Sequence, residues 1–144
     1  MNLLNMGVNI VALEKNDKLY GMACAWATMV GTEELVLLLG SQSETANILE
    51  IGDKIGVSAL SINQKDCAIL FGSYHSSKKN KFINQDYSLN QGAITIKNAK
   101  VQMQCEVFNI TRVKGNNEDF LVFAKVIAQE VNKKEKFLSM EDID

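Results

Sequence analysis

The spacing of apolar positions predicts strands through the first half of the chain. Residues 8–13 and 19–30 form two predicted strands around the polar turn 14–18, where Asn and Asp tolerate turn geometry. Residues 35–39 are a continuous apolar run, typical of a strand buried on both faces, and residues 54–60 predict another strand. A β-hairpin therefore opens the predicted domain.

The second half of the chain is also patterned as strand. Apolar and polar residues alternate over 101–107, and the apolar phase then shifts to Phe108 and Ile110, as a bulge or barrel bend requires. Residues 114–117 predict a turn into a long strand over 120–131. About six or seven strands are expected in total.

Two short helices interrupt these strands. Helical spacing follows a Ser43 cap as far as Gly52, and a second helix is expected from an Asn63 cap to Gly72. Residues 73–92 are polar and irregular, so loops are expected there. The predicted fold class is mainly β with short helices, an antiparallel barrel with helical insertions.

Composition limits the chain to a few classes of protein. Its 144 residues suit one domain, and 47% hydrophobic with 22% charged residues is ordinary for a globular protein. A net charge of -2 and a single arginine, Arg112, argue against nucleic-acid binding. No segment approaches the ~20 apolar residues of a membrane span, and no signal sequence is evident, so we expect a soluble cytoplasmic protein without membrane contact.

The domain prediction divides the chain at residue 132. Residues 1–132 form the predicted domain, and residues 133–144 are a charged C-terminal tail. This tail is either a frayed end or a short helix that docks on a partner subunit.

Residues typical of catalysis are sparse. Cys24, Cys67 and Cys105 are far apart with no CxxC pair, which predicts reduced thiols, mostly in the core, and no metal site. His75 is the only histidine and lies in a polar segment, where a solvated surface position is favoured over ligand contact. No catalytic residue is assigned, since neither a nucleophile elbow nor a glycine-rich dinucleotide motif is present.

The clearest local candidate for ligand binding is a hydroxyl-rich turn at a helix start. Backbone N–H groups and hydroxyls over residues 41–45 suit a phosphate, although capping explains Ser43 equally well and Glu44 would repel an anion. A Ser- and Lys-rich segment, 76–81, is either a second anion contact or a solvated basic loop. Trp26 lies among small residues, where it either fills the core or flanks a flat ring.

These pieces, taken in order, resemble the flavin reductase-like, FMN-binding split-barrel family. The resemblance covers roughly residues 8–131. The matching elements are Ala25-Trp26-Ala27-Thr28, the apolar run 35–39, Ser43-Glu44-Thr45, Phe71-Gly72, Ser76 through Lys81-Phe82, and the strand around Cys105.

The resemblance implies a flavin site in two parts. Backbone N–H groups near residues 25–28 would bond flavin N5 and O4, while the turn and the Lys-rich segment would hold the FMN phosphate. The implied cofactor-binding residues are Ala25, Trp26, Ala27, Thr28, Ser41, Gln42, Ser43, Thr45, Ser76, Lys78 and Lys81. It also implies a homodimer with FMN near the interface.

Two departures from the family pattern bear on activity. Residues 32–34 replace a Pro-Pro pair, and Asp119 stands where the family has a histidine linked to nicotinamide use. Three hypotheses therefore remain: an oxidoreductase that passes electrons from NADH or NADPH through FMN to flavin, a metal complex or a protein; a non-catalytic FMN-binding or electron-carrying module; and a barrel that has lost flavin and serves as an interaction module.

Overall fold

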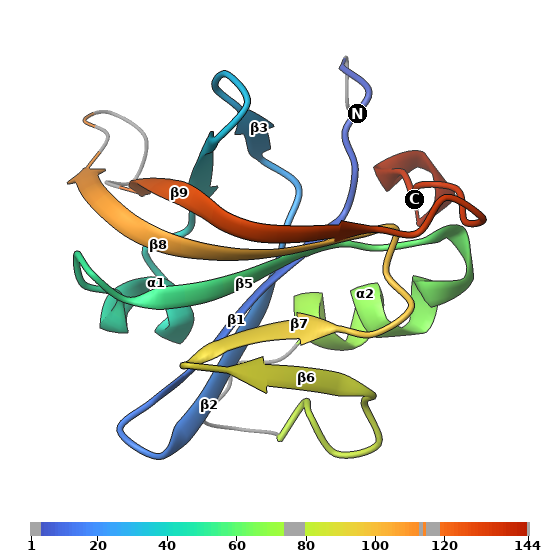
Figure 1. The fold of residues 1–144 in the computed structure, drawn as a ribbon, viewed down its shortest axis with the longest axis horizontal. Coiled ribbons are helices and arrows are strands. Elements are labelled where there is room, and N and C mark those ends of the chain that lie inside the picture. The colour runs from blue at the N-terminus through green and yellow to red at the C-terminus, as the bar shows by residue number, and fades with distance from the viewer. Residues whose placement is uncertain (1–3, 74–79, 113, 115–118, 144) are drawn as a thin grey trace.

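The computed structural model describes residues 4–73, 80–112, 114 and 119–143. Two α-helices, two 3-10 helices and nine strands occur within them (Figure 1). Their bounds are β1 Asn9–Lys15, β2 Lys18–Cys24, β3 Ala27–Met29, β4 Glu34–Leu39, α1 Glu44–Ile48, β5 Lys54–Ala59, η1 Ile62–Gln64, α2 Lys65–Ser73, β6 Tyr87–Asn90, β7 Ala93–Ile96, β8 Val101–Arg112, β9 Phe120–Val131 and η2 Met140–Asp142.

All the strand pairs in the sheet are antiparallel. The described strands follow the order β3-β4-β9-β8-β5-β1-β7-β6, with β2 also paired to β1. Figure 1 shows β8 and β9 running side by side along the molecule, with the β6–β7 hairpin at the opposite edge. The sheet does not close, which agrees with a split barrel, and the predicted mainly β fold class is confirmed.

Strand β1 separates two hydrophobic cores because its side chains alternate between them. Val11 and Leu13 point into the barrel core, which β4, β5, β8 and β9 complete. Val8, Ile10 and Ala12 point into the second core, which α2 covers. This double burial explains why residues 8–13 are almost continuously apolar.

Strand β7 crosses very close to β5, and Gly56 makes this approach possible. A Cβ atom at residue 56 would lie 1.7 Å from the carbonyl oxygen of Ile94. The buried Ser58 hydroxyl accepts a hydrogen bond from the Ile96 N–H at 2.9 Å, which fixes β7 beside β5. The absent side chain therefore lets the β7 backbone lie directly against β5.

Several sequence predictions were wrong at the level of individual elements. The predicted strand 19–30 divides into β2 and β3, and β3 turns away to pair with β4. The predicted loop region 73–92 contains β6, which pairs with β7. Strands β6 and β7 were not predicted because neither shows alternating buried and exposed positions. Strand β6 is largely exposed, and strand β7 is buried on both faces.

The structure confirms some of the predicted helix boundaries and the predicted bulge, and it corrects the others. The first helix begins after Ser43 as predicted but ends at Ile48, before Gly52. The second is preceded by a 3-10 turn whose N-cap is Ser61, so the predicted Asn63 cap was wrong. A register shift between Val107 and Asn109 confirms the bulge expected around Phe108.

The C-terminal segment packs against its own chain. Phe137 bridges to Ser61, and Ser139 bridges to Gly7. Leu138, only 1% exposed, fills the second core together with residues of β1 and α2. The segment is therefore not frayed at these positions, and it contains the short 3-10 helix η2. Docking on a partner subunit and the domain boundary at residue 132 stay predictions.

Candidate functional site

A groove brings together the four residues of the predicted ring contact. Ala25, Trp26, Ala27 and Thr28 line a hollow of ≈ 410 Å³. Its other lining residues are Leu4, Asn5, Met6, Gly7, Val36, Leu38 and Leu121. We call this hollow the 25–28 groove.

The outward face of β4 forms the floor of the groove, although this face was predicted to be buried. Leu35, Leu37 and Leu39 face the barrel core, but Val36 and Leu38 are only half-buried and face the groove. Both faces of β4 were expected to be buried, and this was wrong. The sequence could not show that one face of β4 is less buried than the other. The two faces of a strand are distinguished by alternating apolar and polar residues, and residues 35–39 are all apolar.

Strand β3 is an edge strand of the sheet and lies beside this groove. The Leu38 N–H donates to the Trp26 carbonyl at 2.9 Å, and the Val30 N–H donates to Glu34 at 2.8 Å. Because alternate residues of a strand bond on opposite sides, the N–H and C=O groups of Ala27 and Met29 face away from β4. The Ala27 N–H donates locally to the Ala25 carbonyl at 3.1 Å.

Trp26 is not a core residue. Its side chain is 54% exposed, at the corner where β2 ends and β3 begins. The core-filling interpretation is therefore wrong, whereas a position beside a flat ligand remains consistent with this geometry. Small neighbours at 25 and 27 leave the indole face accessible from the groove.

Several donors of the 41–45 turn already have partners within the chain. The Ser43 hydroxyl caps α1 by accepting from the Ala46 N–H at 3.3 Å, and it lies 3.0 Å from the Met22 sulfur. Thr45 is 1% exposed, so its side chain is enclosed in the fold. Gln42 is exposed, and Ser41 and Ser43 are half-buried.

Asp119 contacts this turn from a distant part of the chain. Its Oδ1 accepts a hydrogen bond from the Ser41 N–H at 3.0 Å, and Asp119 is only 9% exposed. The turn follows β4 and Asp119 precedes β9, and these two strands pair with each other. The pairing explains how residues 78 positions apart meet.

Lys81 is turned inward rather than toward solvent. It is 3% exposed, and its Nζ donates to the carbonyls of Gly21 at 2.9 Å and Phe71 at 3.1 Å. Burial lowers the pKa of Lys81, while the charge of Glu44 acts in the opposite direction. The fold thus brings Lys81 near the start of α1, with two of its three donors engaged.

Three residues singled out in the sequence lie outside the described residues. They are His75, Ser76 and Lys78. Their predicted roles stay predictions.

The cysteines are buried, free thiols, as predicted. Burial raises the pKa of Cys24 to about 12, although a hydrogen bond with the Trp26 backbone lowers the pKa in part. Burial likewise raises the pKa of Cys67 to about 11 and that of Cys105 to about 12. All three are therefore protonated and unreactive near neutral pH.

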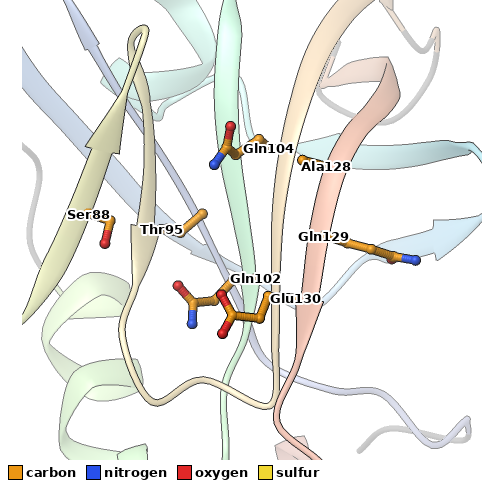
Figure 2. A pocket seen from close by; sticks show the side chains of 7 residues that line it. All are labelled: Ser88, Thr95, Gln102, Gln104, Ala128, Gln129 and Glu130. Carbon is orange, nitrogen blue, oxygen red and sulfur yellow. The ribbon is translucent and has the colours of Figure 1, made fainter.

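A second, polar hollow of ≈ 200 Å³ opens between the β6–β7 hairpin and β8–β9. Figure 2 shows Thr95, Gln102 and Gln104 around this opening, with Glu130 beside Gln102. Gln104 also accepts a hydrogen bond from the Asn90 amide at 2.9 Å. None of the residues predicted to bind a cofactor lines this hollow.

In the part of the chain that the structure describes, no helix is both long enough and apolar enough to span a membrane.

The open, antiparallel sheet with its short helices defines the fold as a split barrel. The sequence matches the family described as "Flavin reductase like domain" over residues 1–141. The chain belongs to this family. A comparison with curated proteins found no match.

Solved structures with the same fold include several flavin proteins. The NADH:FAD oxidoreductase SgcE6 of Streptomyces globisporus C-1027 is 18% identical, with a TM-score of 0.85 over 98% of this chain and 84% of that chain. A second structure of that protein is a complex with NAD and FAD fragments. The flavin reductase PheA2 is 20% identical, with a TM-score of 0.76 over 90% of this chain and 82% of that one.

An FMN-binding protein from Thermus thermophilus also has this fold. It is 13% identical, with a TM-score of 0.80 over 94% of this chain and 79% of that chain. At these identities the similarity establishes the fold, and the chemistry has to be argued from this chain's own residues.

Proposed function

We propose that this protein is a flavin-dependent oxidoreductase that holds FMN in the 25–28 groove and takes reducing equivalents from NADH or NADPH. The acceptor would be a free flavin, a metal complex or a protein. When bound, the flavin supplies the two-electron chemistry by accepting hydride at N5. The chain's own residues supply binding, orientation and exclusion of water.

The observation that carries this proposal is the composition of the groove. Val36, Leu38 and Leu121 offer an apolar floor, and Trp26 offers an aromatic face beside it. The volume of ≈ 410 Å³ lies within the usual range for small-ligand sites, roughly 300–1,000 Å³. These features fit a flat, largely apolar ring system.

The polar edge of such a ring would meet the backbone of residues 25–28. Peptide N–H groups at a sheet edge are fixed donors, and they stabilise negative charge without having to reorganise. Of the β3 groups that face away from β4, the Ala27 C=O and the Met29 N–H would supply this polar edge, because the Ala27 N–H already donates to the Ala25 carbonyl. In this arrangement the chain orients the flavin and needs no acid-base side chain.

The phosphate end is assigned to the 41–45 turn and Lys81. The chain itself links the groove to this turn, because Leu38 lines the groove and Ser41 follows the end of β4. The proposed contacts here are Ser41, Gln42, Ser43, Thr45 and Lys81, with Ser76 and Lys78 proposed from the family resemblance alone.

Flavin binding is tested by titration of the purified protein with FMN, followed by flavin fluorescence and the visible spectrum. We expect saturable binding near one FMN per chain. Trp26→Ala is expected to weaken binding about tenfold, because an aromatic stacking contact is worth roughly 1–3 kcal/mol for a nucleobase. Ile127→Ala, an exposed apolar residue on β9 outside the groove, is the matched control. Absence of saturable binding would refute the proposal.

A non-catalytic FMN-binding or electron-carrying module is the second candidate. Asp119 favours it, because this residue stands where the family histidine linked to nicotinamide would be and is bonded to Ser41. Adding NADH or NADPH to the FMN-loaded protein without oxygen separates the two. Bleaching of the flavin absorbance supports the oxidoreductase, and an unchanged spectrum supports the carrier.

We also propose a homodimer that uses the outer face next to the groove. Phe108 is exposed there, and the Phe108 and Phe123 rings lie 6.2 Å apart. Clustered apolar side chains of this kind are typical of interfaces. Sedimentation velocity should give about twice the 16.0 kDa chain mass, and Phe108→Glu should shift the protein toward monomer.

A further inference from the structure

The Asp119 carboxylate lies on the turn that would receive the flavin phosphate. Its Oδ1 accepts from the Ser41 N–H at 3.0 Å, and Asp119 is nearly buried. A phosphate could use this N–H only by displacing the carboxylate. The position is therefore already occupied by an anionic group of the chain itself.

Two neighbouring N–H groups and part of the Lys81 ammonium are engaged as well. The Ser43 N–H donates to the Gly40 carbonyl at 3.0 Å, and the Ala46 N–H donates to the Ser43 hydroxyl. Lys81 directs two of its donors to backbone carbonyls. Glu44, at the first position of α1, adds a second carboxylate close to the same place.

Among the described residues that line the groove for the ring, none carries a charged side chain. Its lining includes the half-buried apolar side chains Val36, Leu38 and Leu121 and the exposed Trp26. The ring can therefore bind without displacing a group of the chain, whereas a phosphate would have to displace Asp119 from the Ser41 N–H and would meet like charge.

We infer that Asp119 is a specificity-determining residue whose charge cancels the affinity that the phosphate group of FMN would add. The protein then binds flavins mainly through the ring system, and it binds riboflavin about as tightly as FMN. This inference rests on the proposed flavin function. Charge repulsion by Asp119 offsets the contacts that the phosphate makes with the turn. Removal of this charge should restore a preference for the phosphorylated flavin.

The test compares FMN with riboflavin by fluorescence titration of the full chain. For the wild type, the two dissociation constants should agree within about threefold. Asp119→Asn keeps an oxygen that accepts from Ser41 but removes the charge, so FMN should bind about tenfold more tightly and riboflavin within twofold of the wild type. Higher salt should also favour FMN over riboflavin in the wild type, because it screens the repulsion.

Glu130→Gln is the matched control, since it removes the same charge from the other end of β9. Eleven residues of extended strand place it roughly 35 Å from Asp119. Both dissociation constants should be unchanged in this variant. If Asp119→Asn does not fold, the salt dependence of the wild-type FMN-to-riboflavin ratio still decides the matter.

The outcomes separate the inference from the function on which it rests. If neither flavin binds, the proposed function fails and the inference fails with it. If both bind but wild-type FMN binding is more than tenfold tighter than riboflavin binding, the inference alone is overturned. An unchanged ratio in Asp119→Asn overturns it equally.

Discussion

Replacement of Gly56 by alanine should severely destabilise this fold. A Cβ atom there would lie 1.7 Å from the Ile94 oxygen and 2.3 Å from its carbonyl carbon. Both are backbone atoms, so no side-chain rotation can relieve the overlap. Strand β7 would have to move away from β5 by roughly 1.5–2 Å to reach an ordinary van der Waals contact.

The energetic cost of this movement can be estimated from the contacts it breaks. The Ile96 N–H would separate from the buried Ser58 hydroxyl, and an unsatisfied buried group costs about 1–3 kcal/mol. Overpacking of a core adds about 1–3 kcal/mol. We expect a loss of about 4 kcal/mol, against a total stability of roughly 7–20 kcal/mol for a domain of this size.

Urea unfolding followed by circular dichroism measures this loss. With a slope of roughly 2 kcal/mol per M, the midpoint should fall by about 2 M. Gly72→Ala is the matched control. Gly72 lies in α2, and a Cβ atom there would make an ordinary contact of 3.7 Å with the Ala23 side chain. Alanine at this position also favours the helix by up to about 1 kcal/mol. A Gly56→Ala loss below about 1 kcal/mol would refute the close crossing of β7.

Three further predictions concern other parts of the chain. Lys15→Met should cost about 1–2 kcal/mol in urea unfolding, because the Lys15 Nζ bonds Glu50 at 2.6 Å and Asp53 at 2.8 Å, although exposure of Glu50 weakens that pair. Burial alone would lower the pKa of Lys15, but these two carboxylates outweigh it and raise the pKa above 10.5. The loss should therefore be largest below pH 10.5 and shrink as the pH rises through the raised pKa; a loss independent of pH up to 12 would contradict this. The three buried thiols should not react with a disulfide reagent at pH 7 until the protein is unfolded, and rapid labelling of the native protein would show that burial is incomplete. Emission from Trp26 should be accessible to acrylamide in the free protein and protected by FMN; equal quenching with and without FMN would remove Trp26 from the site.

The positions of Trp26 and Val36 show why the site could be predicted only in part. The family resemblance predicted that residues 25–28 share a ligand surface. The structure brings the four residues to one groove, and ligand binding there stays a prediction. The exposure of Trp26 and the outward face of β4 depend on strand β3 leaving β2 to pair with β4. Local sequence carries little information on such a change of partner, because small residues suit both a strand and a corner.

Asp119 shows a similar division between sequence and structure. Its departure from the family pattern was visible in the sequence, but its hydrogen bond to Ser41 was not. The bond depends on the register between β4 and β9, in which Leu39 lies opposite Phe120. Register is a property of two paired strands, so it follows from tertiary packing.

The sequence by itself determined the class of this protein. Alternating apolar residues, polar turns and a capped first helix were enough to predict a mainly β domain with short helices, because these signals act within a few residues. The tertiary structure alone decided which strands meet, where Gly56 lets β7 cross β5, and which donors of the 41–45 turn remain for a ligand. Those features arise from contacts between residues far apart in the chain, and no local pattern encodes them.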